Sequence, residues 1–166
     1  MEPNMQKYQL TKGEMLALLD RSKMGVIATV DADGSPYATP INYILMDGRV
    51  FFHGRKQGMK MANLEKDPRC SFTVVDEGGF ERCGDDACNT TSIYESVIIK
   101  GTVKVIDDFE TKRKVLRTTV DKLTPERKAD SMNDKAVGPA GVYEIVIEEM
   151  TGKYHRPAPG NRIFKA

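Results

Sequence analysis

Short segments rich in β-branched residues, joined by turn-forming sequences, run through the first half of the chain. Residues 26–30 lead into a stretch dense in Asp, Gly and Pro, and residues 37–45 form a second such segment. Asp47-Gly48 follows, a strong hairpin signal because a type I′ turn needs positive φ at both central residues. Residues 50–53 then supply a third strand. Strands that follow one another through tight turns pair antiparallel, and the pattern predicts a small β-barrel.

Helical periodicity marks three other segments. Thr11 begins a capping box, which predicts a helix over residues 12–21. A second helix is predicted over residues 59–65, just before an Asp-Pro pair that stops the pattern. The third helix is capped by Asp107 or Asp108, and its predicted apolar face consists of Phe109, Leu116, Val120 and Leu123.

The remaining segments complete the predicted sheet. Residues 70–75, 94–106 and 142–147 have strand character, and Gly101 is expected to mark a bulge or a bend. Residues 76–92 show no periodicity, so we interpret them as a loop at the rim of an active site. The prediction is a mainly β, α+β fold of about six antiparallel strands with flanking helices. Gly-rich dinucleotide and P-loop fingerprints are absent, which disfavours a Rossmann enzyme or a nucleoside triphosphatase.

Length and charge limit the function classes. The 166 residues suffice for a single domain over 1–166, with a core of about 8–153 and a C-terminal tail of 154–166. Lys and Arg number 25 against 24 Asp and Glu, so nucleic acid is not expected as a partner. No apolar run approaches the roughly 20 residues that cross a bilayer, so no membrane segment is expected. Three cysteines and an N-terminus without signal-peptide character predict a cytoplasmic protein.

Pro40 is the most informative residue of the second strand. Proline lacks an amide donor and is confined to strand edges or bulges, so this strand is expected to have a rim whose backbone groups face something other than a neighbouring strand. A flat heterocycle with alternating donors and acceptors would suit that rim. A shielded edge without a ligand explains the proline equally well.

Cations and glycines gather between the third strand and the second helix. Lys60 falls in the first turn of that helix, where a cation is unfavourable with the helix dipole unless an anion offsets it. Helix-start amides and cations together could form a phosphate site, although a solvated surface cluster fits the same residues. His53, at the strand end, is either a structural residue or a catalytic base. The segment contains His53, Gly54, Arg55, Lys56, Gly58 and Lys60.

The cysteines give little support to a metal site. Cys83 and Cys88 have four residues between them, and only His53 and His155 could complete a ligand set. Structural zinc sites favour repeated Cys pairs or a spaced His pair, neither of which occurs. We therefore predict no metal. The two cysteines are expected to line a loop, with reversible oxidation as an alternative.

Three ordered groups of residues together resemble a known superfamily. They are residues 24–37 with Pro40-Ile41-Asn42-Tyr43, then Phe52-His53-Gly54 leading to Gly58, Lys60 and Asn63-Leu64, and then Tyr94, Ser96-Val97 and Gly101. Over roughly residues 8–153 the set resembles the FMN-binding split-barrel superfamily of pyridoxamine 5'-phosphate oxidase-related proteins, and it is most similar to the nitroimidazole-resistance (Nim-type) branch. The resemblance implies a six-stranded antiparallel split β-barrel that forms a homodimer with two FMN sites at the interface.

The same resemblance implies where FMN would bind. The strand around Pro40 would meet the isoalloxazine ring, the segment after His53 would hold the phosphate, and the long strand would close the site. Lys60 is the implied phosphate ligand, and His53 is the candidate catalytic residue. The implied residues are, in that order, Thr39, Pro40, Ile41, Asn42 and Tyr43, then His53, Gly54, Arg55, Lys56 and Lys60, then Ser96 and Val97.

The implied activity is that of an FMN-dependent oxidoreductase, a reductase of small electron-poor compounds such as nitroimidazoles and nitroaromatics. Electrons would come from a reduced nicotinamide or another donor. Pyridoxamine phosphate oxidases proper carry an arginine-containing strand at residues 39–44 and a C-terminal Arg/His motif, and neither is matched well, since the tail reads Tyr154-His155-Arg156-Pro157. That oxidase is the enzyme alternative, and a non-catalytic flavin-binding, haem-binding or stress-related protein is the other.

Overall fold

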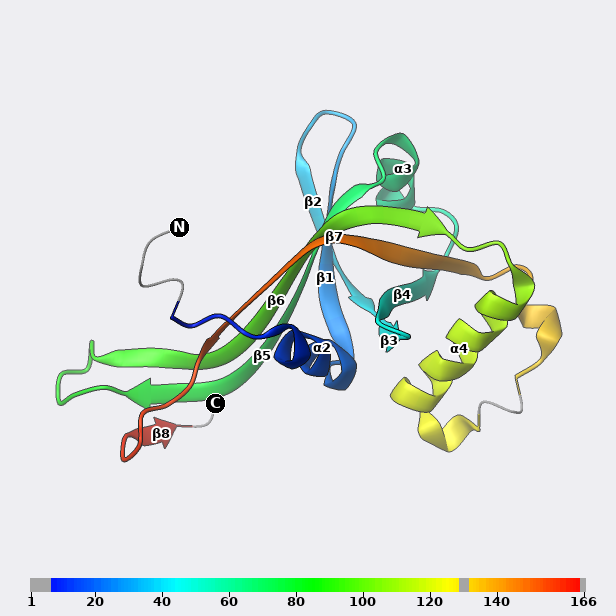
Figure 1. The fold of residues 1–166 in the computed structure, drawn as a ribbon. Helices are drawn as coiled ribbons and strands as arrows, with labels where there is room; N and C mark the ends of the chain where they lie inside the picture. Colours follow the sequence, from blue (N-terminus) through cyan, green and yellow to red (C-terminus); the bar gives the residue numbers. More distant parts are fainter. Residues whose placement is uncertain (1–6, 129–131, 165–166) are drawn as a thin grey trace.

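A computed structural model of the chain shows a long, curved antiparallel sheet with helices packed against it (Figure 1). The structure describes residues 7–128 and 132–164. Its helices are α2 (Lys12–Arg21), α3 (Met59–Lys66) and α4 (Phe109–Leu123), with 3₁₀ turns at Pro125–Arg127 and Asp134–Ala136. Its strands are β1 (Met24–Val30), β2 (Pro36–Asn42), β3 (Ile44–Met46), β4 (Arg49–Gly54), β5 (Arg69–Arg82), β6 (Thr90–Val105), β7 (Gly141–His155) and β8 (Arg162–Phe164).

The sheet is open. Its strand order is β2-β1-β5-β6-β7-β4-β3, with β8 added to β5, and every pair is antiparallel. β2 and β3 stand at the two ends of this order, so the barrel is split between them. The α+β split-barrel prediction is confirmed. The predicted count of six strands is wrong, because the described residues form eight.

Tyr43 divides the predicted second strand into β2 and β3. Its ring packs edge-on against Phe72 with 5.0 Å between centroids, and its hydroxyl donates to the Leu19 carbonyl oxygen at 2.8 Å. These contacts hold Tyr43 inside the barrel, and the next residue, Ile44, is buried as well. Two consecutive buried residues end the alternation that residues 37–45 were expected to keep.

The larger of two hydrophobic clusters among the described residues forms the core of the barrel. Helix α2 covers it, and the helix begins at Thr11 with the predicted capping box: the Thr11 hydroxyl accepts from the Glu14 amide, and the Glu14 carboxylate accepts from the Thr11 amide. The core residues that are at most 1% exposed include Leu18, Leu19, Ile27, Phe72, Val97, Ile99 and Ile145.

β5 and β6 extend past the barrel as a two-stranded arm, which is seen at the left of Figure 1. They pair from Asp76↔Glu95 to Arg82↔Thr90, and only residues 83–89 connect them, so the predicted loop over 76–92 is wrong. Residues 76–78 are exposed. Because a ribbon outside the barrel has no core to face, its sequence lacks the apolar alternation that identifies a strand.

The irregularity predicted at Gly101 is present, and the extra residue, Glu148, lies on the facing strand β7. The register against β7 shifts between Lys100 and Gly101, and a Cβ at Gly101 would collide with the Val146 carbonyl oxygen. Glycine therefore permits the close approach of the two strands.

The C-terminal segment folds back on the arm. β7 continues to His155, beyond the predicted end at residue 147, and β8 pairs with β5. The Glu81 carboxylate, 2% exposed, accepts hydrogen bonds from His155 Nε2 at 2.6 Å, the Ala158 amide at 2.7 Å and Asn161 Nδ2 at 2.6 Å. We call these four residues the Glu81 clasp.

α4 packs against β3 and β4 along one narrow face. Asp108, one of the two residues predicted to cap this helix, is its N-cap, and its carboxylate accepts a hydrogen bond from the Thr111 amide at 2.8 Å. The predicted apolar face is wrong in part: Phe109 is 41% exposed, whereas Val115 is fully buried against β3 and β4 and Leu116 is partly buried there. In the described ranges no helix combines the length and the apolar character that a bilayer crossing needs.

Candidate functional site

The strand around Pro40 is β2, and it lies at an edge of the sheet, as its proline predicts. It pairs with β1 on one side, where Pro40 stands opposite Val26. Pro40 and Asn42 are exposed and Thr39 is half-buried, while Ile41 is buried in the core. The outer rim of β2 therefore presents backbone groups that no neighbouring strand uses among the residues described.

β4 and α3 bring the predicted cationic segment together. His53 and Gly54 end β4, where it pairs with β7. Partial loss of hydration lowers the pKa of the His53 imidazole below its usual value, so the neutral ring predominates at pH 7. Arg55 and Lys56 follow on the surface, and neither forms an ion pair with a residue that the structure describes.

Lys60 lies half-buried in the first turn of α3. Its Nζ is 5.0 Å from the centroid of the Phe52 ring, and no oxygen atom of the described residues accepts a hydrogen bond from it. Burial lowers the pKa of its ammonium group. Gly58 caps the helix with φ 115° and no side chain, and no acid lies in the first turn, so the first amides also lack a side-chain acceptor. A cation beside free helix-start amides fits a phosphate group.

An apolar cleft of about 410 Å³ lies next to this segment. Its walls come from α3, the end of β6, the start of β7 and the start of α4, and they include Lys56 and Tyr143. Tyr143 stacks on Phe52 with 5.0 Å between ring centroids, so one aromatic pair lies between Lys60 and the cleft. The sequence did not single out Tyr143 or the buried Lys112 of this cleft, because a tyrosine in a strand and a lysine on a helix carry no pattern that marks a site.

Ser96 and Val97 lie elsewhere. Val97 is fully buried in the barrel core, and Ser96 is half-buried between β5 and β7. Along β6, Ser96 precedes the cleft residue Val103 by seven positions, about 23 Å of extended strand. Within one chain the structure does not bring Ser96 and Val97 to the cleft.

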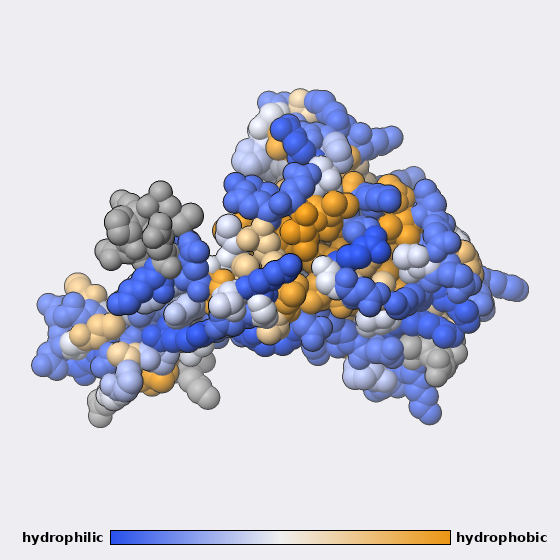
Figure 2. Space-filling model, viewed as in Figure 1, coloured by the Kyte–Doolittle hydropathy of each residue, from blue (hydrophilic) through white to orange (hydrophobic). Residues whose placement is uncertain are grey.

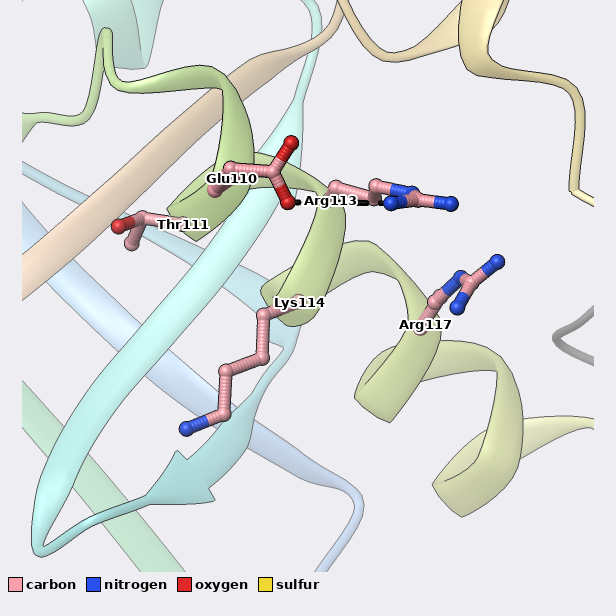
Figure 3. A pocket seen from close by; sticks show the side chains of 5 residues that line it. All are labelled: Glu110, Thr111, Arg113, Lys114 and Arg117. Carbon is pink, nitrogen blue, oxygen red and sulfur yellow. Dashed lines mark ion pairs between the residues drawn. The ribbon is translucent and has the colours of Figure 1, made fainter.

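A second hollow lies on the outer face of α4 and holds several charges (Figure 3). Arg113 contacts Glu110 at 3.8 Å and Asp134 at 3.1 Å, and Lys114 contacts Asp47 at 2.9 Å. Because carboxylates already balance these two cations, the hollow has less to offer an anion than the start of α3.

Comparison with known proteins places the chain in a family. The sequence model of the family described as pyridoxamine 5'-phosphate oxidase matches residues 11–154. No curated protein matches the chain at a significant level.

Solved structures share the fold. The flavocytochrome Anf3 of Azotobacter vinelandii is 23% identical with a TM-score of 0.79, and the match covers 94% of this chain and 72% of that one. A FAD and heme binding protein of Mycobacterium smegmatis is 22% identical with a TM-score of 0.77, covering 89% and 73%. A candidate 5-nitroimidazole antibiotic resistance protein of Bacteroides thetaiotaomicron is 23% identical with a TM-score of 0.73, covering 87% and 85%.

The sequence resemblance is thus confirmed at the level of the superfamily. The motifs that carried it, from β1 through β6, all fall inside the matched range. With most of its length matched by the family model, the chain belongs to the pyridoxamine 5'-phosphate oxidase family of split-barrel proteins.

Proposed function

We propose that this protein binds FMN between the β2 rim and the start of α3 and acts as a reductase of small electron-poor compounds such as nitroaromatics. The observation that carries the proposal is Lys60, a half-buried cation without an acceptor among the described residues, at a helix start whose amides have no side-chain cap. An anion placed there would offset both the buried charge and the helix dipole.

The chain's own residues would divide the work. Lys60 and the first amides of α3 hold the phosphate, with Arg55 and Lys56 near it. The backbone of the β2 rim from Thr39 onward offers donors and acceptors along the flavin ring. Bound flavin would supply the electron transfer, while the protein positions the ring. His53, neutral at pH 7, can accept or pass on a proton at an imidazole nitrogen.

Structures of similar fold favour flavin over other anions as the ligand. The structures of similar fold include a flavocytochrome and FAD binding proteins. We favour FMN over FAD because one compact cationic segment, residues 55–60, suits a single phosphate group. The thiols of Cys83 and Cys88 are free and exposed, which suits a reducing cytoplasm with reduced nicotinamide as the electron donor.

Two rival functions have specific observations for or against them. Oxidation of pyridoxamine phosphate would need free C-terminal cations, but Arg156 donates to Glu14 at 2.8 Å and to Glu95 at 2.9 Å, and His155 contacts Glu81. A non-catalytic binding protein is the stronger rival, because a structure of similar fold is named as a FAD and heme binding protein.

Anaerobic spectroscopy distinguishes a reductase from a binding protein. We expect the FMN-loaded protein to lose its yellow colour on addition of reduced nicotinamide and to regain it on addition of a nitroimidazole. If nicotinamide fails as donor, the flavin is reduced photochemically and its reoxidation by the nitroimidazole is compared with that of free reduced FMN. Reoxidation no faster than that of free FMN would favour the non-catalytic function.

A further inference from the structure

The cleft between α3 and α4 contains a buried charge that nothing in the proposed flavin site uses. Lys112, on the second turn of α4, is 5% exposed and lines this cleft. Its Nζ donates to the Gly138 carbonyl oxygen at 2.7 Å, and no carboxylate contacts it among the residues described. An ammonium group has three donors, so a neutral carbonyl leaves both its charge and further donors without a partner.

The other charges of the cleft lie at its rim. Glu65, Asp107 and Lys56 are all exposed, so water screens them. Among the charged residues that line the cleft, Lys112 is the buried one. The lower dielectric constant around it strengthens its attraction for an anion. The cleft therefore favours a negative group at its inner end.

Tyr143 adds a second donor. The residue is 3% exposed, its ring is fixed against Phe52, and its hydroxyl has no hydrogen-bond partner within residues 7–128 and 132–164. The remaining walls are apolar and include Met61, Leu64 and Val103. A volume of about 410 Å³ is in the range of pockets that hold small organic molecules.

We propose that this cleft is a binding site for a small organic anion with an apolar body, separate from the phosphate site at Lys60. The acid group, a carboxylate or a sulfonate, binds Lys112 Nζ and the Tyr143 hydroxyl, and the apolar body lies against Met61, Leu64 and Val103. The site requires no flavin, because none of these side chains belongs to the β2 rim, and the phosphate site at the start of α3 uses Lys60 and backbone amides rather than the side chain of Met61.

A matched pair of fluorescent probes tests the charge. Anilinonaphthalene sulfonate carries the anion, and phenylnaphthylamine has the same rings without it. Titration of the FMN-loaded protein should show that Lys112→Met weakens binding of the sulfonate about tenfold or more and leaves phenylnaphthylamine unchanged. Lys114→Met, on the exposed side of the same helix, is the control and should bind both probes like the wild type.

Two further measurements locate the site. In spectra of methionine labelled with ¹³C at the methyl group, the sulfonate should shift the Met61 signal and leave that of the exposed, distant Met24 in place. If Lys112→Met does not fold, Tyr143→Phe, which keeps the ring and removes the hydroxyl, should weaken sulfonate binding alone. Equal losses for both probes, an unmoved Met61 signal, or displacement of the sulfonate by FMN from the flavin-free protein would overturn the proposal.

Discussion

His53 and Lys60 stand at the two ends of a short connection, and loss of hydration lowers the pKa of both side chains. Loss of hydration disfavours the charged form of each side chain. For Lys60, which has no acidic partner in the described chain, keeping the charge therefore costs free energy. Bound phosphate would reverse this cost at Lys60. It would leave His53 neutral, and so able to exchange a proton close to neutral pH.

Replacing His53 separates a catalytic role from a structural one. If the imidazole delivers a proton to the substrate, His53→Ala should lower nitroaromatic turnover per bound FMN by roughly 10²-fold while flavin affinity and the thermal midpoint stay near those of the wild type. Because loss of hydration lowers the pKa of His53, its imidazole is protonated only at a more acidic pH than usual, so the wild-type rate should rise as pH falls below neutral.

The other histidine provides the control for this experiment. His155 lies at the end of β7 beside the arm, away from β4. The variant His155→Gln should therefore keep the wild-type rate and its pH profile. An unchanged rate per bound flavin in His53→Ala, or a loss of flavin with normal turnover, would remove His53 from the catalytic residues.

At the scale of the helices and strands, the sequence predicted what local chemistry decides. Thr11, Asp108, Pro40 and Gly101 each act through their own backbone or their nearest neighbours, and the caps, the edge strand and the bulge were found where those residues indicate. The break at Tyr43 depends on Leu19 and Phe72, which are distant in sequence, so no local pattern could reveal it.

The same limit applies to the site. Lys60 was found from its place in a helix start, which a sequence shows directly. Lys112 and Tyr143 were missed because their significance depends on how the chain packs. Lys112 is buried without a carboxylate beside it, and the buried Tyr143 has no acceptor for its hydroxyl among the described residues. The arm was missed for a related reason, since its sequence lacks the apolar alternation that marks a strand packed on a core.

The Glu81 clasp should make the attachment of the C-terminal segment depend on pH. The Ala158 amide, then His155 and Asn161, hold the pKa of the Glu81 carboxyl below its usual value. A carboxyl with a lowered folded-state pKa stabilises the folded form above its unfolded pKa of about 4.3, and this contribution disappears as pH falls through the folded value. Hydrogen exchange in β8 should therefore accelerate below about pH 4, after correction for the intrinsic rate.

A charge-removing variant checks the cause. Glu81→Gln should speed β8 exchange about tenfold or more at pH 7 and abolish its acid dependence. Glu77→Gln, at an exposed position of the same strand, should behave like the wild type. Exchange in β8 that is the same in all three proteins would show that the clasp does not hold the segment.

For the whole molecule, the exposed surface suggests a partner. Figure 2 shows apolar residues gathered near the middle of one face of the molecule. Exposed apolar side chains on β6 and β7 include Ile98 and Val146. The rim of β2 is also unpaired in the described chain. Open edges and apolar patches favour association, and a two-fold dimer is its commonest form.

We therefore propose a homodimer in which each flavin site is completed by the partner. Sedimentation equilibrium at micromolar concentration with excess FMN should give twice the chain mass of 18.5 kDa. Ser96 and Val97, which one chain does not bring to Lys60, could then approach the flavin of the other subunit. A sedimentation mass of one chain under these conditions would rule the dimer out.

The central claim is that Lys60 and the start of α3 hold the phosphate of FMN, and paired titrations with FMN and riboflavin test it most directly. Riboflavin has the same ring without the phosphate. Lys60→Ala should weaken FMN binding roughly ten- to a hundredfold and leave riboflavin binding almost unchanged, while Lys66→Ala, at the other end of α3, should alter neither. Equal losses for FMN and riboflavin, or no loss for either, would contradict the claim.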